Sequence, residues 1–185
     1  MAETNTSKSE DEMPLYKGSC HCGNIKFTVR LNLTSPSPET GHIMTRCNCT
    51  ICLKAGLTLA VPTPVTSFTL LSPLPEGTTS PINYSQYPDD KPFPGLAEYT
   101  FGGGRVQHQF CPTCGVRGWV KGVIIGPSNK DFSFMRINVH TLDGREDGAE
   151  IESLKDIKIG YWDGVNDKDG WAKGVGEKPY DRGIL

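Results

Sequence analysis

The chain has 185 residues, of which 36% are hydrophobic and 22% are charged, and its formal net charge is -2. This length and composition are typical of one globular domain with a modest core. Lysines and arginines such as Lys121 are isolated and expected at the solvated surface, which argues against nucleic acid as a partner. No stretch approaches the roughly 20 apolar residues that cross a bilayer, so we expect no membrane partner either.

The first 13 residues are polar and acidic without periodicity, which predicts a disordered N-terminal tail. They lack the apolar run of a signal peptide, and we therefore expect a cytoplasmic protein. Thiols stay reduced in that compartment, which favours metal binding over disulfides. The chain has seven cysteines, and this odd number would leave one thiol unpaired in a disulfide framework.

Residues 15 to 31 alternate between apolar and polar side chains and predict two strands. Cys20 and Cys22 fall between these strands, at the tip of the expected hairpin. His21 separates them and would point the other way on an extended backbone, so we predict that it is not a metal ligand.

The composition of residues 32 to 41 predicts a loop, which we interpret as an insertion, and a run of three cysteines follows it. Cys47, Cys49 and Cys52 can reach one metal ion, and residues 50 to 55 suit a short helical turn capped by Thr50. Three ligands leave the fourth position of a tetrahedral zinc ion for water or substrate, as in catalytic sites. His42 is an alternative fourth ligand, although a loop histidine is more often simply solvated.

Residues 57 to 71 suggest strands broken by prolines. Residues 72 to 95 are so rich in proline that we expect a long surface loop, which could border a substrate cleft. Three consecutive glycines then predict a hairpin turn before a strand at residues 106 to 110, which runs into Cys111 and Cys114. Their C-x-x-C spacing, with Pro112 between them and Gly115 after them, is that of a zinc knuckle.

Two further strands are expected at residues 118 to 125 and 132 to 140, and residues 151 to 157 suit either a helical turn or a strand. The predicted fold is therefore mainly β, with one zinc-binding domain at residues 14 to 162 and a C-terminal extension at residues 163 to 185. The seven thiols divide into four plus three, which would suit two zinc ions per chain. Cationic side chains next to the cysteine motifs are candidates for binding a substrate carboxylate, although each is more often a surface charge: Arg46, Lys54, Arg105 and Arg117.

The motifs at residues 18 to 23, 47 to 54 and 110 to 115 resemble the three signatures of the glutathione-dependent formaldehyde-activating enzyme family, also called the CENP-V/GFA domain. The resemblance spans residues 15 to 142 and implies several coiled antiparallel β-sheets of the Mss4-like class, stapled by zinc. It implies a structural zinc ion held by Cys20, Cys22, Cys111 and Cys114, and a second, catalytic ion held by Cys47, Cys49 and Cys52.

The same resemblance implies a carbon-sulfur lyase that interconverts glutathione and formaldehyde with S-hydroxymethylglutathione. The expected partner is thus a small-molecule thiol or thiol-aldehyde adduct. The insertion at residues 32 to 41 and the proline-rich segment depart from the family pattern and could reshape the pocket. The alternative is a non-catalytic binding module of Mss4-like fold, in which zinc only stabilises the structure.

Overall fold

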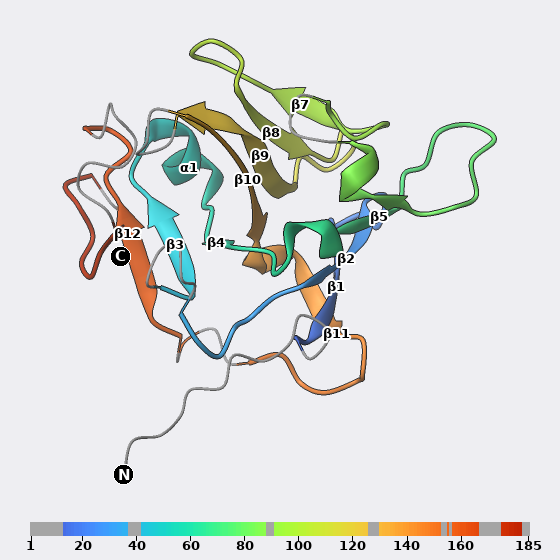
Figure 1. Ribbon diagram of the computed structural model, residues 1–185, viewed down its shortest axis with the longest axis horizontal. Helices are drawn as coiled ribbons and strands as arrows, with labels where there is room; N and C mark the ends of the chain where they lie inside the picture. The colour runs from blue at the N-terminus through green and yellow to red at the C-terminus, as the bar shows by residue number, and fades with distance from the viewer. Residues whose placement is uncertain are drawn as a thin grey trace.

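A computed structural model describes residues 13–36, 42–87, 91–125, 130–152, 155, 157–166 and 175–182. Within these residues the protein is mainly β, as predicted, and its strands form two sheets (Figure 1). The predictions for residues 1 to 12 of the N-terminal tail, for the second half of the insertion and for residues 153, 154 and 156 lie outside the described residues.

The smaller sheet has five strands in the order β11-β1-β2-β5-β6, and all neighbours are antiparallel. Its strands are β1 (Leu15–Ser19), β2 (Lys26–Arg30), β5 (Thr69–Ser72), β6 (Ile82–Asn83) and β11 (Leu142–Arg145). The predicted hairpin is confirmed, because β1 pairs with β2 from Leu15 opposite Arg30 to Ser19 opposite Lys26. Apolar side chains on alternate positions of β2, Phe27 and Val29, are buried, as a half-buried strand requires.

The larger sheet has eight strands in the order β13-β12-β3-β4-β10-β9-β8-β7. Its strands are β3 (Met44–Cys47), β4 (Leu59–Ala60), β7 (Ala97–Tyr99), β8 (Val106–Phe110), β9 (Arg117–Ile125), β10 (Asp131–Asn138), β12 (Ile159–Trp162) and β13 (Val175–Gly176). The pairing is antiparallel except between β3 and β12, which run parallel and place Trp162 opposite Cys47. The expectation of antiparallel sheets is therefore corrected at this one pair, which joins segments far apart in the chain.

Helical segments are short, and one of them contains a cysteine, Cys52. They are α1 (Thr50–Ala55) and the 3-10 turns η2 (Val65–Ser67), η3 (Tyr84–Gln86) and η4 (Val139–Thr141). The residue that precedes α1 and has extended backbone angles is Cys49, and no side chain caps the helix. The predicted Thr50 cap is wrong, because Thr50 already lies in the first turn. Gly56 ends the helix in the left-handed conformation, with φ of 62°.

An aromatic cluster fills the core between the two sheets. The Trp119 ring lies 4.8 Å from Phe68, 5.6 Å from Phe27 and 5.7 Å from Phe93, measured between ring centroids. Edge-to-face arrangements at these separations are favourable. The Trp119 indole N–H donates to Gln109 Oε1 at 2.6 Å, so its polar atom is satisfied inside the core.

The proline-rich segment at residues 72 to 95 is more ordered than its composition suggests. It supplies strand β6 and turn η3, and the side chain of Phe93 is buried in the core. Lys121, expected at the surface, is instead fully buried, and its ammonium donates to the backbone carbonyls of Tyr87, at 2.9 Å, and of Lys91. The same ammonium lies 4.8 Å from the Phe93 ring centroid. These contacts hold the segment against β9.

Candidate metal centres

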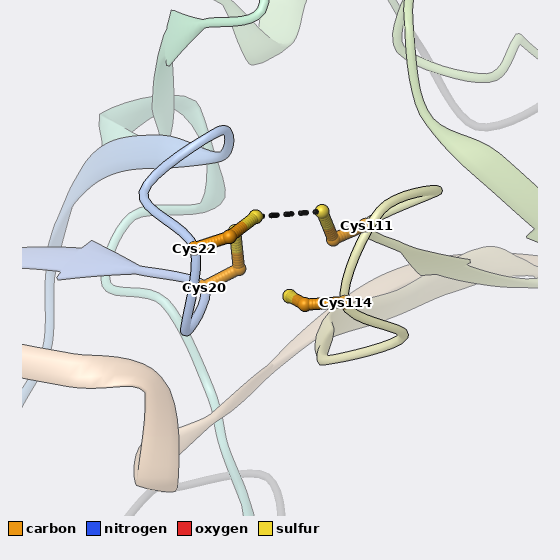
Figure 2. Close-up of side chains that lie close together, drawn as sticks. All are labelled: Cys20, Cys22, Cys111 and Cys114. Atoms are coloured by element: carbon orange, nitrogen blue, oxygen red, sulfur yellow. Dashed lines mark hydrogen bonds between the residues drawn. The ribbon is translucent and has the colours of Figure 1, made fainter.

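Four cysteines meet between two turns that lie far apart in the sequence. Figure 2 shows Cys20 and Cys22, from the β1–β2 hairpin, facing Cys111 and Cys114, from the turn between β8 and β9. All four sulfurs lie within 4.8 Å of one another, and the Cys20–Cys22 and Cys22–Cys111 sulfur pairs are 3.6 and 3.5 Å apart. Zinc–sulfur bonds of about 2.3 Å in a tetrahedron separate the sulfurs by roughly 3.8 Å. The four thiols therefore fit a closed zinc site.

Each of the two turns is shaped by a glycine with positive φ. Gly23 has φ of 74° and its N–H donates to the Cys20 carbonyl at 3.0 Å, while Gly115 has φ of 75° and its N–H donates to the Cys111 carbonyl at 2.9 Å. Burial disfavours the Cys111 thiolate, but hydrogen bonds from the backbone N–H groups of Cys114 and Thr113 outweigh it and lower the pKa of Cys111 to about 6. The turn is thus suited to hold a thiolate near neutral pH.

The second cluster comes from one short stretch. Cys47 ends β3, Cys49 precedes α1, and Cys52 lies in the helix, and their sulfurs lie within 4.8 Å of one another. Among the described residues no further histidine, cysteine or carboxylate joins this group. His42 is buried with Nε2 3.4 Å from the Val175 carbonyl oxygen, and the geometry does not support it as a fourth ligand. His21 likewise does not belong to the four-cysteine group.

The three thiols of the second cluster share their protons unequally. Hydrogen bonds from the Cys47 and Cys52 thiols, with help from backbone N–H groups, lower the pKa of Cys49 to about 2. In turn, the hydrogen bond to Cys49 raises the pKa of Cys47 to about 11, and the hydrogen bonds to Cys47 and Cys49 raise the pKa of Cys52. Among the three sulfurs, the thiolate is therefore favoured on Cys49. Binding of a cation by all three sulfurs would release the protons that remain on the other two.

The chain that follows β12 lies directly on this second cluster. The Asn48 amide donates to Asp163 Oδ1 at 2.8 Å and to the Asp181 carbonyl at 3.2 Å, and its Oδ1 accepts from the Val165 N–H at 3.1 Å. A Cβ atom at Gly164 would come closer than 3.0 Å to Cys47 Sγ. Residues 163 to 165 and Asp181 of the predicted C-terminal extension thus lie against the segment that carries the cluster. Sequence reasoning missed this contact because it depends on the long-range β3–β12 pairing.

A cleft of about 580 Å³ opens beside Cys49. Its described lining includes three cationic side chains, two exposed aromatic rings and no carboxylate: Cys49, Thr50, Ile51, Lys54, Tyr99, Phe101, Arg117, Gly164, Val165 and Arg182. This volume is in the range of small-molecule sites. Sequence reasoning missed Tyr99, Phe101 and Arg182, for which no motif in the chain offers a signal.

The four cationic side chains proposed to bind a substrate carboxylate lie at different places in the structure. Arg117 and Lys54 line the cleft, and Arg117 Nη1 is buried without a hydrogen-bond partner among the described residues. Arg46 lies in a smaller cavity of about 150 Å³ with Cys47, and its Nε donates to Thr58 Oγ1 at 3.0 Å. Arg105 pairs with Asp131 at 3.1 Å and does not line the cleft.

The proline-rich segment contributes no described residue to the lining of this cleft, so the expectation that it borders the substrate finds no support there. In the described part of the chain, no helix has the length and apolar character to span a membrane.

Comparison with known proteins adds little to this geometry. No model of a known protein family matches the chain, and no curated protein matches it. The chain is similar to a protein of Rhodobacter sphaeroides with a solved crystal structure, at 23% identity over 69% of this chain and 88% of that one, with a TM-score of 0.41. A likeness at that score carries no argument about fold or function.

Proposed function

We propose that this protein is a zinc-dependent carbon-sulfur lyase that interconverts a thiol and an aldehyde with their adduct, of which S-hydroxymethylglutathione is the reference compound. The observation that carries the proposal is the group of Cys47, Cys49 and Cys52, with no fourth described donor, beside a cation-lined cleft. Structural zinc sites take four protein ligands, whereas catalytic sites take three and leave one position for substrate. The four-cysteine group is the structural site in this proposal.

Zinc bound by the three thiolates would supply the charge that makes a substrate thiol ionise near neutral pH. The substrate sulfur then forms a bond to the aldehyde carbon, and the carbonyl π electrons move to oxygen, which takes up a proton. In the reverse direction the hydroxyl loses its proton, the carbon-sulfur bond breaks and the thiolate leaves. Three thiolate ligands weaken Lewis acidity, so thiol ionisation is favoured over polarisation of the aldehyde.

The chain's own residues position this chemistry. Buried Leu57, Leu59 and Val120 pack behind Cys52 and fix the cluster on its inner side. On the open side, Arg117 and Lys54 bring positive charge to the cleft, where a substrate carboxylate can pair with them. The proposal also includes a reducing compartment such as the cytoplasm, since all seven thiols must stay available for metal.

The test compares two substitutions in the zinc-loaded protein. Zinc per chain, thermal unfolding and the rate of adduct formation from glutathione and formaldehyde, above the spontaneous rate, are measured for each variant. Cys111→Ser is expected to lower stability strongly, because a structural zinc site contributes folding free energy. Cys49→Ser is expected to stay folded and to lose turnover.

Two outcomes would count against the lyase. One is a wild-type protein that binds two zinc ions but forms the adduct no faster than buffer. The other is a Cys49→Ser variant that unfolds as readily as Cys111→Ser, since both ions would then only stabilise the fold. Either result would favour the non-catalytic binding module.

A further inference from the structure

The cleft has aromatic rings in its lining, which a reaction with a one-carbon aldehyde does not require. Tyr99 and Phe101 are 48% and 49% exposed, and their rings are stacked at 5.8 Å between centroids and 26° between planes. Phe101 stacks in turn on His108 with the same separation and angle. His108 is only 2% exposed, so the ladder of three rings has a fixed base and an open end at Tyr99.

Two rings of this ladder, Tyr99 and Phe101, line the cleft. Exposed large aromatic side chains that lie together usually mark a binding surface. A ring or similarly flat group of a ligand can continue the stack on Tyr99, with a gain beyond simple burial of area. Formaldehyde has no such group, and the cleft of about 580 Å³ is far larger than one carbon atom requires.

The cleft is also positively charged. Lys54, Arg117 and Arg182 line it, and no described lining residue is acidic, although the whole chain has a net charge of -2. Arg117 Nη1 is buried and has no hydrogen-bond partner in the described part of the chain, and a buried guanidinium N–H of this kind is best satisfied by an anionic acceptor. The guanidinium carbon of Arg117 also lies 5.4 Å from the Phe110 ring centroid, which holds the side chain in place.

Arg182 reaches the cleft through the C-terminal segment. Asn48, between two of the cluster cysteines, donates to the carbonyl of Asp181 at 3.2 Å. Arg182 itself has a positive φ of 68°, a conformation that most residues avoid. Asn48 therefore links the segment that carries the cysteine cluster to the segment that carries Arg182.

Resting on the lyase function proposed above, we propose that the substrate thiol carries both an aromatic group, which stacks on Tyr99, and a carboxylate, which pairs with Arg117 and Lys54. The substrate sulfur lies toward the cluster of Cys47, Cys49 and Cys52. The aromatic ring and the carboxylate of the substrate occupy the cleft beside that cluster. Tyr99 and Arg117 are then specificity-determining residues, and neither takes part in bond making.

The test uses four thiols that separate the two features: 4-(sulfanylmethyl)benzoate, benzyl thiol, 3-sulfanylpropanoate and propanethiol. Dissociation constants for the zinc-loaded protein are measured by calorimetry, and turnover is measured separately with each formaldehyde adduct. We expect 4-(sulfanylmethyl)benzoate to bind at least about tenfold more tightly than either thiol that lacks one feature.

Matched variants assign the two contacts. Tyr99→Ala should weaken binding of the aromatic thiols about fivefold and leave the aliphatic thiols within twofold, whereas Tyr99→Phe keeps the ring and should bind like the wild type. Arg117→Gln should remove most of the preference for carboxylates, and Arg105→Gln, outside the cleft, should not. Lys54→Gln, at an exposed position, repeats the charge test if Arg117→Gln folds poorly.

The outcomes separate this inference from the lyase proposal. Four dissociation constants within threefold of one another, or equal losses for aromatic and aliphatic thiols in Tyr99→Ala, would overturn the inference even if adducts are turned over. Selective binding without turnover of any adduct would support the inference and refute the lyase. If no thiol binds, both are wrong.

Discussion

Gly164 offers a steric test of the second metal centre, because its backbone angles do not require glycine. Its φ lies outside the range that disfavours other residues, so alanine is acceptable to the backbone. Alanine would instead clash with neighbouring side chains, since the added methyl carbon would lie under 3.0 Å from Cys47 Sγ and 3.1 Å from Cys49 Cβ. Carbon and sulfur atoms in contact are separated by roughly 3.5 Å or more. In Gly164→Ala, therefore, either the sulfur or the segment at residues 163 to 166 must move by at least about 0.5 Å.

A displacement of that size exceeds what a metal site tolerates. Distances between a metal ion and its ligands vary by only about 0.2 Å in plausible sites. We expect Gly164→Ala to weaken zinc binding at the second centre by at least about tenfold, which corresponds to about 1.4 kcal/mol. The four-cysteine centre should keep its affinity, because Gly164 does not contact it.

The assay is a competition titration of zinc against a chromophoric chelator, with zinc per chain measured by mass spectrometry. Gly144→Ala is the matched control, since a Cβ atom there meets no atom within 4 Å and its φ is unrestrictive. The control should bind two ions as the wild type does. If Gly164→Ala also binds two ions with unchanged affinities, then Cys47 is not a ligand of a rigid second centre, and the reasoning fails.

Three further predictions concern protons and the core. In metal-free protein at pH 6, iodoacetamide should modify Cys49 before the other two thiols of its cluster, because their hydrogen bonds lower the pKa of Cys49; equal labelling by mass spectrometry would contradict this. Burial, and then the charge of Arg117, lower the pKa of His108 to about 4, which NMR titration can measure. Since the unfolded histidine binds protons more tightly, the free energy of unfolding should fall by on the order of 2 kcal/mol as the pH drops from 6.5 to 4. Trp119→Phe should lower the free energy of unfolding by about 2 kcal/mol in urea denaturation, because it leaves the buried side-chain oxygen Oε1 of Gln109 without its hydrogen-bond donor. An unchanged free energy of unfolding would mean that water replaces the indole N–H as the donor.

Spacing and periodicity in the sequence were enough to predict the division of the cysteines and the two turns that carry four of them. Cys111 and Cys114 lie in a tight turn because Gly115 accepts a positive φ, and Cys20 and Cys22 lie between two alternating strands. These features depend on a few neighbouring residues, so local rules apply to them. The prediction that the fold is mainly β succeeded for the same reason.

Only the tertiary structure decided what surrounds the second cluster. Asn48 contacts Asp163 and Gly164 lies on Cys47 because β12 pairs in parallel with β3, and nothing local to either strand specifies that partner. The burial of Lys121 similarly depends on carbonyls supplied by a distant segment. Parallel pairing and the burial of a charge both depend on partners remote in the chain, whose side chains carry no pattern that identifies them in advance.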